Sequence, residues 1–557
     1  MSQSAQIVQQ SVLSLKPLAE QLLLALKGYG AKEIFGIPGD FVLPFFKEIE
    51  ANDILPLYTL SHEPAIGFAA DAAGRYHGTL GVACITYGAG ALNMINPIAT
   101  AYAEKSPLVV ISGAPSLAER GRDMALHHQV KHLDSQMMIM REVTCAQCVL
   151  DDPQTAPHEI ARVLKAARDL SRPVYIELPR DMPSVMMEEV PAYSPPVPNE
   201  AAAKAAAKDT MQFLKQSKAP ALLLGVEVRR FNLEDKVVQL AARLGIPVVT
   251  TFMARGILAG HSNLDVETYI GLAGPETSRR FVEASDGLLM LGVIMSDTNF
   301  GVSARQIKAA NRVLAVDQTI HHEHHSFSDI ALSAFIDALL DEAEPLSVSV
   351  TSTQSERSEN AIDLDSPITP ETVADTVSCF FDAHGSMPIA SDMGDCLFTA
   401  MDINHAELLA PGYYATMGTG IPFGIGLEVA SAKRPLVLVG DGAFQMTGWE
   451  LGNCKRLGLV PIVLVFNNRA WGMLKAFQSE TAYNDLDEWN FAEIAETLGG
   501  KGTRVSTPAT LLRALEEAKA DTTKFQLIEI MLPREAKSKT LTRFTEILGQ
   551  KNATTNL

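Results

Sequence analysis

Short runs of apolar, β-branched residues recur along the whole chain, separated by glycine-containing turns and by longer stretches with helical periodicity. Examples are EIFGI, GVACITY and PLVVISGA early in the chain, ALLLG and GLLMLG in the middle, and PLVLVG and PIVLVF near the end. Runs this continuous have no face suited to water, so each is expected to be a strand covered on both faces. Their alternation with helical stretches predicts an α/β fold of doubly wound parallel sheets.

Two changes in composition divide the 557-residue chain into three blocks. Residues 190–208 are rich in proline and then in alanine and lysine, and residues 347–367 are polar with few large apolar side chains. Both segments are expected to be linkers. We therefore predict three doubly wound parallel-sheet domains, each large enough to bury its own core, at residues 1–190, 205–345 and 368–557.

The charge and hydropathy of the chain exclude several classes of partner. A formal net charge of -19 offers no basic surface for nucleic acid or an anionic membrane. No apolar run is long enough to cross a bilayer, and the N-terminal segment lacks a basic region, so a cytoplasmic protein is expected. The six cysteines are too sparse for a disulfide framework. Cys145 and Cys148 have redox or zinc-ligand spacing, but they lie in a strand-like segment and are interpreted as structural.

Two strand ends in the last block carry oxygen ligands suited to magnesium. PLVLVGDG ends in Gly440, Asp441 and Gly442, and PIVLVFNN ends in Asn467 and Asn468. Parallel sheets bind ligands at the carboxyl ends of their strands, and a glycine turn before a helix N-terminus favours a diphosphate. The side-chain oxygens of Asp441 and Asn468 are donors that hold Mg²⁺ on a diphosphate. An Asx turn and a helix cap that only shape the loops are the alternative.

The GDG turn, its spacing from the NN pair and the strand before each element resemble the motif of thiamine diphosphate-dependent enzymes. The resemblance implies that thiamine diphosphate and Mg²⁺ are the cofactors. It also implies that Asp441, Asn468 and the backbone carbonyl of Ala470 are the metal ligands. Met417 matches the residue that packs beneath the bent cofactor, and the carbonyl of Ala415 matches the partner of its 4′-amino group. The full set of implied cofactor contacts is Glu63, Thr86, Asp395, Ala415, Met417, Gly440, Asp441, Gly442, Ala443 and Asn468.

Glu63, in LYTLSHEPAIGFAADAAGRY, is expected at a strand-to-helix junction. Taken alone, it would be a first-turn residue that complements the helix dipole. The family resemblance instead makes Glu63 the carboxylate that pairs with the pyrimidine N1′ of the cofactor. In the family, this glutamate and the diphosphate site come from different subunits. The resemblance therefore implies a homodimer at least, and a homotetramer as the expected assembly.

An aspartate and a histidine doublet distinguish among the branches of the family. Asp40 follows a strand and a glycine turn in FGIPGDF, and ALHHQVKHLD contains His127 and His128. Consecutive side chains normally diverge, so a doublet usually includes one structural member. In thiamine diphosphate decarboxylases of simple 2-oxo acids, however, an aspartate of this kind and an HH doublet handle protons together. Both elements match that branch, which implies a 2-oxo acid substrate. Segments along the chain, such as LSHEPAIGFAADAAGRY, SRPVYIELPR and GDGAFQMTGWELGNCKRLG, resemble the bacterial phenylpyruvate/indolepyruvate decarboxylases. A carboligase or oxidase, such as acetolactate synthase or pyruvate oxidase, and a catalytically silent subunit are the alternatives.

The chain departs from the family pattern shortly after the Asn pair. Many pyruvate and indolepyruvate decarboxylases have a catalytic glutamate where this chain has Leu474, and a leucine cannot carry a proton. Asp297, in LGVIMSDTNFG, is a candidate replacement, and a loop-capping aspartate is the alternative. Met473, Leu474 and Phe477 have helical spacing and either line the substrate pocket or serve plain helix packing. An apolar wall would favour aryl or long or branched aliphatic 2-oxo acids over pyruvate.

A histidine-rich tract, IHHEHH at residues 320–325, follows the strand-like run RVLAVD in the middle block. It is expected to be a solvated loop, with incidental metal binding as the alternative. The same block lacks the complete glycine fingerprint of a dinucleotide site, so neither FAD nor NAD is expected.

Overall fold

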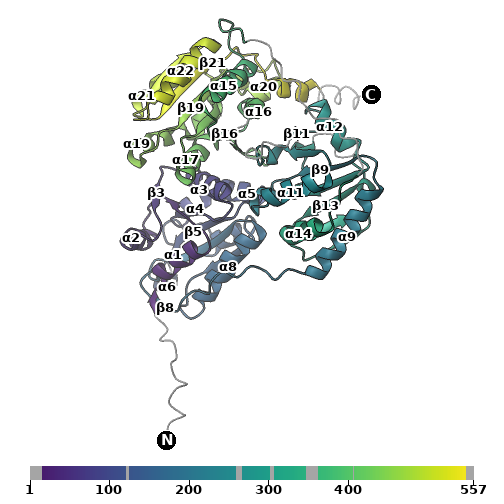
Figure 1. The fold of residues 1–557 in the computed structure, drawn as a ribbon. Coiled ribbons are helices and arrows are strands. Elements are labelled where there is room, and N and C mark those ends of the chain that lie inside the picture. The colour runs from purple at the N-terminus through teal and green to yellow at the C-terminus, as the bar shows by residue number, and fades with distance from the viewer. Residues whose placement is uncertain are drawn as a thin grey trace. The chain divides into compact units, whose positions relative to one another are not determined.

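The computed structural model describes residues 15–120, 124–258, 266–300, 307–346, 362–404 and 407–546. Three sheets of parallel or mostly parallel strands with flanking helices confirm the predicted α/β fold class (Figure 1). The chain forms two compact units. Unit 1 comprises Met1–Ala70, Thr79–Tyr102 and Ser106–Pro195, and unit 2 comprises Asp71–Gly78, Ala103–Lys105 and Pro196–Leu557. Unit 1 holds one sheet and unit 2 holds two, and the boundaries of the three domains stay a prediction.

The first sheet has six parallel strands in the order β3-β2-β4-β5-β7-β6. Its strands are β2 (Ile34–Gly36), β3 (Leu57–Thr59), β4 (Gly81–Ile85), β5 (Leu108–Ala114), β6 (Ala146–Val149) and β7 (Val174–Pro179). The intervening helices are α1 (Leu18–Gly28), α2 (Leu43–Asn52), α3 (Glu63–His77), α4 (Ala89–Asn93), α5 (Ile95–Ala103), α6 (Leu117–Arg120), α7 (Ser135–Arg141) and α8 (Ala156–Leu170). A short antiparallel pair, β1 (Lys16–Pro17) and β8 (Met186–Met187), accompanies this sheet.

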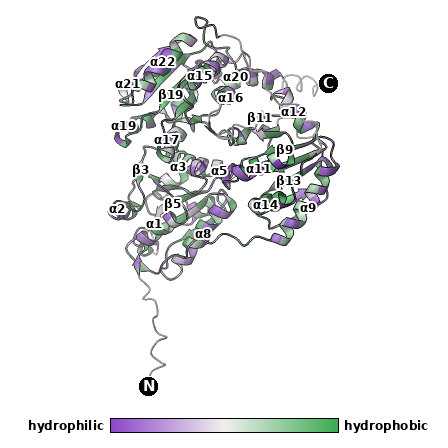
Figure 2. Cartoon of the chain, in the orientation of Figure 1, coloured by the Kyte–Doolittle hydropathy of each residue, from purple (hydrophilic) through white to green (hydrophobic). Residues whose placement is uncertain are grey.

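Helix α8 illustrates how the sequence builds the layers of unit 1. Pro157 occupies its first turn, where a missing N–H does no harm. Apolar residues then recur every three or four positions, and the buried ones are Ile160, Val163, Leu164 and Ala167. They pack in one core with strand residues such as Val109 and Ile176. Figure 2 shows the hydrophobic colouring of β5, whose seven residues are all buried, as expected for a strand covered on both faces.

The middle sheet is mixed, in the order β11-β10-β9-β12-β13-β14-β15. Its strands are β9 (Pro220–Leu224), β10 (Val248–Thr251), β11 (Glu267–Tyr269), β12 (Gly287–Leu291), β13 (Arg312–Val316), β14 (Thr319–His322) and β15 (His325–Phe327). The last two are antiparallel to their neighbours, whereas the other five are parallel. The helices are α9 (Glu200–Gln216), α10 (Glu227–Arg230), α11 (Glu234–Leu244), α12 (Glu276–Glu283), α13 (Asp297–Phe300) and α14 (Leu332–Glu342), with short 3₁₀ turns η1 (Phe252–Ala254) and η3 (Ala309–Asn311).

Two expectations about unit 2 are wrong. The second half of the supposed linker at residues 190–208 belongs to helix α9, which begins at Glu200 because the Asn199 side chain caps the Ala202 N–H. The histidine tract is not a loop, since His322 and His325 pair across the antiparallel hairpin β14–β15. Residues 347–361 of the second supposed linker lie outside the described residues.

The last sheet again has six parallel strands, in the order β17-β16-β18-β19-β21-β20. Its strands are β16 (Ile389–Ser391), β17 (Leu408–Leu409), β18 (Leu436–Gly440), β19 (Ile462–Asn467), β20 (Lys501–Val505) and β21 (Gln526–Met531). The helices are α15 (Pro370–His384), α16 (Asp395–Asp402), α17 (Gly420–Ser431), α18 (Asp441–Thr447), α19 (Cys454–Leu457), α20 (Gly472–Phe477), α21 (Phe491–Thr497) and α22 (Pro508–Ala520), with 3₁₀ turns η4 (Gly448–Asn453) and η5 (Ala482–Asn484).

The first and last sheets share one topology, and the topology locates their binding edges. In each sheet the second strand along the chain lies on one side of the first strand and the third strand lies on the other side. The chain therefore leaves β2 and β4, and likewise β16 and β18, in opposite directions. Such a switch point opens a crevice at the carboxyl ends of the two strands, where ligands bind in open α/β sheets. Within the described part of the chain, the search for a helix able to cross a membrane finds none.

Candidate active site

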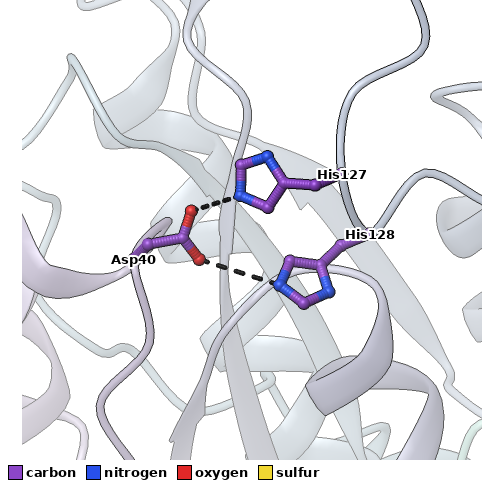
Figure 3. Close-up of side chains that lie close together, drawn as sticks. All are labelled: Asp40, His127 and His128. Atoms are coloured by element: carbon purple, nitrogen blue, oxygen red, sulfur yellow. Dashed lines mark hydrogen bonds and ion pairs between the residues drawn. The ribbon is translucent and has the colours of Figure 1, made fainter.

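Asp40 lies in the turn between β2 and α2, at the switch point of the first sheet. Gly39 precedes it, and a Cβ added at Gly39 would lie 2.4 Å from the Cβ of Thr86, so only glycine lets the turn pass this close. The Asp40 carboxylate forms a hydrogen bond of 2.5 Å with His127 Nε2 and lies 3.9 Å from His128 Nε2 (Figure 3). The structure thus brings together the three predicted proton-handling residues, whose catalytic roles stay a prediction.

A left-handed backbone turn lets both rings of the histidine doublet face Asp40. His128 has φ 66°, so its side chain does not diverge from that of His127 as it would in a helix or strand. Gly88 makes room for this turn, because a Cβ there would lie 2.1 Å from the His128 carbonyl oxygen. The buried ring of Phe41 stacks on the His127 ring with centroids 4.7 Å apart. Tertiary packing therefore places the rings of both histidines beside Asp40.

Glu63 is the first residue of α3, next to the same crevice. Its Oε2 accepts a hydrogen bond of 2.9 Å from Asn93 Nδ2. A Cβ at Gly90 would lie 3.3 Å from Glu63 Oε1 and 3.0 Å from Thr86 Cγ2, so this glycine leaves space between the two side chains. The hydroxyl of Thr86 is buried and has no hydrogen-bond partner among the described residues. An unpaired buried hydroxyl beside a carboxylate fits the edge of a polar ligand.

Asp441 begins α18 directly after β18, at the switch point of the last sheet. It is 4% exposed, and its two oxygens accept the backbone N–H groups of Gly442 at 2.9 Å and Arg469 at 2.6 Å. Burial raises the pKa of Asp441 to about 6, although hydrogen bonds from backbone N–H groups oppose the rise. Asn468 lies in the adjoining loop, where its Oδ1 accepts the Ala470 N–H at 3.1 Å. The side-chain oxygens of Asp441 and Asn468 are donors of the kind that Mg²⁺ takes, and their assignment as metal ligands together with the Ala470 carbonyl stays a prediction.

The first member of the Asn pair has a different partner. Asn467 is 1% exposed and donates to Glu529 Oε1 at 2.7 Å, which ties the end of β19 to the neighbouring strand β21. Glu529 is fully buried and also accepts the Ala492 N–H at 3.1 Å. Asn467 therefore holds the strand end in place, and the role of Asn468 as a metal ligand stays a prediction.

The loop of residues 415–420 is held by a carboxylate that the sequence reading missed. Asp392 follows β16 directly and is 0% exposed. It accepts the backbone N–H groups of Gly418 at 3.0 Å and Gly420 at 2.6 Å, and burial raises its pKa to about 7. Ala415 is exposed in the same loop with φ 59°, a conformation that alanine rarely adopts, and Met417 is half-buried. The loop is thus fixed in a strained shape at the switch point where Asp441 lies.

The structure gives two further predicted site residues protein partners of their own. Asp395 begins α16 and accepts the Ser538 N–H at 2.9 Å, and burial raises its pKa. Asp297 begins α13, is exposed and accepts the Thr298 N–H at 2.8 Å, as a capping aspartate does. Both interactions are structural in kind, and the assignments of Asp395 to the cofactor and of Asp297 to catalysis stay predictions. Ala443 is buried in the first turn of α18 and Gly440 ends β18.

The three candidates for the substrate pocket on α20 differ in exposure, and the ring of Phe477 contacts Phe544, which packs in the same cluster as Met473. Met473 packs against a cluster that includes Phe252 and Phe398. Leu474 and Phe477 are 55% and 41% exposed, so their apolar side chains remain open to a ligand or to another chain. The structure thus gives Met473 a packing role, and the assignment of the three residues to the substrate pocket stays a prediction.

Of the two residues that the sequence did not predict, only one carries a recognisable signal. Asp392 comes directly after a buried strand, as Asp441 does. It has no flanking GDG turn, however, and was therefore not predicted. Asn93, the partner of Glu63, lies in the GAGALNM segment after β4. Applying the strand-end rule to every strand would have found Asp392, whereas Asn93 sits at the far end of α4, so no such rule finds it.

Three family models match the chain. The N-terminal thiamine pyrophosphate (TPP) binding domain of thiamine pyrophosphate enzymes matches residues 16–138, the central domain of these enzymes matches residues 207–343, and their C-terminal TPP binding domain matches residues 392–530. The strand-end chemistry and these matches place the chain among the thiamine pyrophosphate enzymes, with thiamine diphosphate (the same compound) as its cofactor.

Similar proteins narrow the class further. The indole-3-pyruvate decarboxylase of Azospirillum brasilense is 54% identical over 541 residues, which are 96% of this chain and 98% of that protein. The alpha-keto-acid decarboxylase of Mycobacterium tuberculosis (strain ATCC 25618 / H37Rv) is 31% identical over 533 residues, 93% of this chain and 94% of the relative. That of Mycobacterium avium (strain 104) is 30% identical over 539 residues, with the same coverage of 93% and 94%. The chain belongs to the thiamine diphosphate-dependent 2-oxo acid decarboxylases, which confirms the predicted family.

Proposed function

We propose that this decarboxylase converts aryl 2-oxo acids, such as phenylpyruvate and indole-3-pyruvate, or long or branched aliphatic ones, to the aldehyde and CO₂ without oxidation. The observation that carries the proposal is the convergence of Asp40, His127 and His128 on one point at the switch point of the first sheet. Three groups able to gain or lose a proton, next to solvent, suit a reaction whose product must be protonated before release.

The similar proteins support the substrate class. The most similar of the three relatives described above carries indole-3-pyruvate in its name, and the alignment leaves little of either chain uncovered. Leu474 and Phe477 add an apolar surface after the metal loop, as a pocket for an aryl or aliphatic group requires.

The residues of the site divide the work between binding and proton handling. Thiamine diphosphate supplies a nucleophilic carbon and accepts the electrons released when CO₂ leaves. Asp441, Asn468 and the carbonyl of Ala470 would hold Mg²⁺ on its diphosphate. Glu63, oriented by Asn93, would hold a proton at the pyrimidine ring.

Asp40 and the histidine doublet would deliver protons to the substrate-derived carbon. The side chains of Asp40 and His127 are 42% and 60% exposed, so both groups can exchange protons with water between turnovers. Leu474 cannot take part in this exchange, and the residue that replaces the family glutamate stays open, with Asp297 as the candidate from the sequence.

We infer that the active form is a homodimer at least, and a homotetramer as the expected assembly. Glu63 belongs to unit 1 and Asp441 to unit 2. Large exposed apolar side chains, including Leu43 and Met138 in unit 1 and Trp449 and Tyr483 in unit 2, support burial against another chain. A cytoplasmic location is part of the proposal and is supported by the six cysteines, all of which are free.

A substrate panel tests the proposed function. Initial rates of aldehyde formation from phenylpyruvate, indole-3-pyruvate and pyruvate would be measured with thiamine diphosphate and Mg²⁺ present, and kcat/KM compared. We expect both aryl substrates to exceed pyruvate. A preference for pyruvate would overturn the substrate class. If no 2-oxo acid yields aldehyde although the cofactor is bound, the decarboxylase proposal itself fails.

The oligomeric proposal has its own measurement. Light scattering during size-exclusion chromatography of the cofactor-loaded protein should give at least twice the mass of one chain. An active monomer would contradict the inference.

A further inference from the structure

The hairpin β14–β15 places two of the four histidines of the IHHEHH tract on one face. His322 and His325 are directly opposite each other in the antiparallel register, on either side of the turn at Glu323 and His324. Opposed residues of an antiparallel pair project their side chains from the same face of the sheet. Their ring centroids are 5.4 Å apart. His321, by contrast, pairs with Ser326 and so projects from the other face.

Helix α9 packs beside β15 and contributes a carboxylate to the two histidines. Asp209 Oδ2 lies 2.6 Å from His322 Nδ1 and 3.3 Å from His325 Nε2. A single carboxylate oxygen therefore faces a nitrogen from each ring. One helical turn further, the ring of Phe213 packs on the His322 ring with centroids 4.8 Å apart and fixes its orientation.

Burial singles out one nitrogen of the deeper ring. His322 is 8% exposed, and its Nε2 is buried without a hydrogen-bond partner among the described residues. Its Nδ1 is the ring nitrogen that faces Asp209 and so lies on the side of the cluster. The side chains of His325 and Asp209 are 51% and 35% exposed, so ions and water can reach the cluster from solvent.

The three ligand atoms lie at separations suited to one metal ion. One potential ligand atom from each of Asp209, His322 and His325 falls within 4.8 Å of the others. Ligands bound at about 2.0–2.1 Å in a tetrahedral site stand roughly 3.3 Å apart, which the contact between Asp209 and His325 already matches. The shorter contact to His322 is a hydrogen bond, and a metal ion would replace its proton.

We propose that Asp209, His322 and His325 form a binding site for a divalent transition-metal ion such as Zn²⁺, which clasps hairpin β14–β15 to helix α9. Two imidazoles and one carboxylate are the ligands of Zn²⁺, Ni²⁺ or Co²⁺, whereas Mg²⁺ requires oxygen ligands. The site therefore differs in metal preference from the predicted magnesium site at Asp441. Solvent supplies the fourth ligand from the exposed side. The ion has a structural role and takes no part in the reaction.

Zinc binding by the complete enzyme tests the proposal. The protein would be stripped with a chelator, reloaded with thiamine diphosphate and excess Mg²⁺, and titrated with Zn²⁺ against a chromogenic chelator. We expect His325→Ala and Asp209→Asn each to lose one bound Zn²⁺, or to bind it at least about tenfold more weakly, the loss typical even of a supporting residue. The Asp40 cluster is a second place where Zn²⁺ can bind, so Asp40→Asn should leave this ion in place.

His321→Ala and His324→Ala are the matched controls, because both remove a histidine of the same tract without touching the cluster. They should bind Zn²⁺ as the unaltered protein does. Equal loss in all four histidine and aspartate variants would show incidental binding to a histidine-rich surface and would overturn the proposal. So would unchanged Zn²⁺ binding in His325→Ala and Asp209→Asn.

A second readout does not depend on counting ions. Zn²⁺ should raise the unfolding temperature of the unaltered protein and of His324→Ala, because an ion bound only to the folded state stabilises it. It should have no such effect on His325→Ala, whose exposed position makes the substitution compatible with folding. X-ray absorption of the zinc-loaded protein should show two imidazole ligands, and a spectrum without imidazole would refute the assignment.

Discussion

The first and last sheets have the same strand order, yet they place opposite kinds of carboxylate at their switch points. Asp40, after β2, has a side chain that is 42% exposed and pairs with a histidine. Asp392 and Asp441, after β16 and β18, are 0% and 4% exposed and accept backbone N–H groups. One topology therefore serves two chemistries. Exposure keeps a carboxylate able to exchange protons, whereas burial among backbone donors fixes a loop or prepares a cation site.

The largest expected effects are on activity and cofactor binding, and they should differ between substitutions in the first sheet and in the last. Glu63→Gln removes a charge from the first sheet, and we expect decarboxylation to fall by about 10²–10⁴-fold while thiamine diphosphate and Mg²⁺ still bind. Asp441→Asn removes a charge from the metal site of the last sheet, and we expect cofactor binding itself to be lost. Steady-state rates and a cofactor titration followed by protein fluorescence would measure both. Loss of cofactor binding in Glu63→Gln would contradict the proposal that Glu63 handles protons while Asp441 binds the cofactor.

Matched substitutions at corresponding positions should separate the sheets by stability. Asp392→Asn turns an NH₂ group toward buried backbone N–H groups and should lower the free energy of unfolding by about 2–3 kcal/mol. Asp40→Asn, at an exposed position, should change it by less than about 0.5 kcal/mol while reducing activity. Thermal and urea unfolding of the two variants would be compared. Equal destabilisation would mean that burial does not distinguish the two carboxylates.

The pH dependence of stability should respond to a buried carboxyl group near the last sheet. Glu428, on α17, is 7% exposed and accepts the Val460 N–H at 2.8 Å, and burial raises its pKa to about 7. The folded state therefore keeps the proton that the unfolded chain releases above its ordinary pKa, so this contribution to stability is present at low pH and is lost as pH rises toward 7.

Glu428→Gln keeps the acceptor and removes the titration. In the unaltered protein the free energy of unfolding should fall between pH 5 and pH 7, and in the variant this fall should be smaller by about 2 kcal/mol. Urea unfolding midpoints at the two pH values would measure it. An unchanged difference between the two midpoints would contradict the raised pKa.

The smallest effect should come from one glycine in the metal loop. A Cβ at Gly472 would lie 2.3 Å from Asn468 Nδ2 and would push the carboxamide away. Gly472→Ala should weaken the binding of Mg²⁺ and thiamine diphosphate about tenfold without a large change in unfolding temperature. Gly452→Ala is the control, since its nearest neighbour would lie at an ordinary 3.4 Å. Equal affinity in both variants would remove Asn468 from the metal site.

The sequence predicts the central strands well because their burial on both faces leaves continuous apolar runs. Edge strands are harder to predict because they lack this burial. Strands β11 and β20 are partly exposed and contain polar residues, so they have no continuous apolar run. The hairpin β14–β15 was hidden by its histidines, whose alternation of buried and exposed positions depends on α9 above it. Family motifs identified Asp40, Glu63 and Asp441, but no local pattern encodes partners that come from a distant segment.

The backbone of His128 is the clearest case of a feature that the sequence does not predict. Its positive φ depends on the space left by Gly88, which lies far away in the sequence. A sequence reading can state that two histidines are adjacent, but only the packed structure decides that both point the same way. The same holds for the Asn pair. Asn467 pairs with Glu529 on a neighbouring strand, whereas Asn468 pairs with Ala470 in its own loop.

Asp392 has a consequence for the rates at which the cofactor associates and dissociates. Because it already holds the N–H groups of Gly418 and Gly420, the loop of residues 415–420 is anchored before any ligand arrives. Association then needs no ordering step and proceeds at the speed of diffusional encounter and docking. Differences in affinity among variants of this loop will accordingly appear in the dissociation rate, and stopped-flow mixing can separate the two.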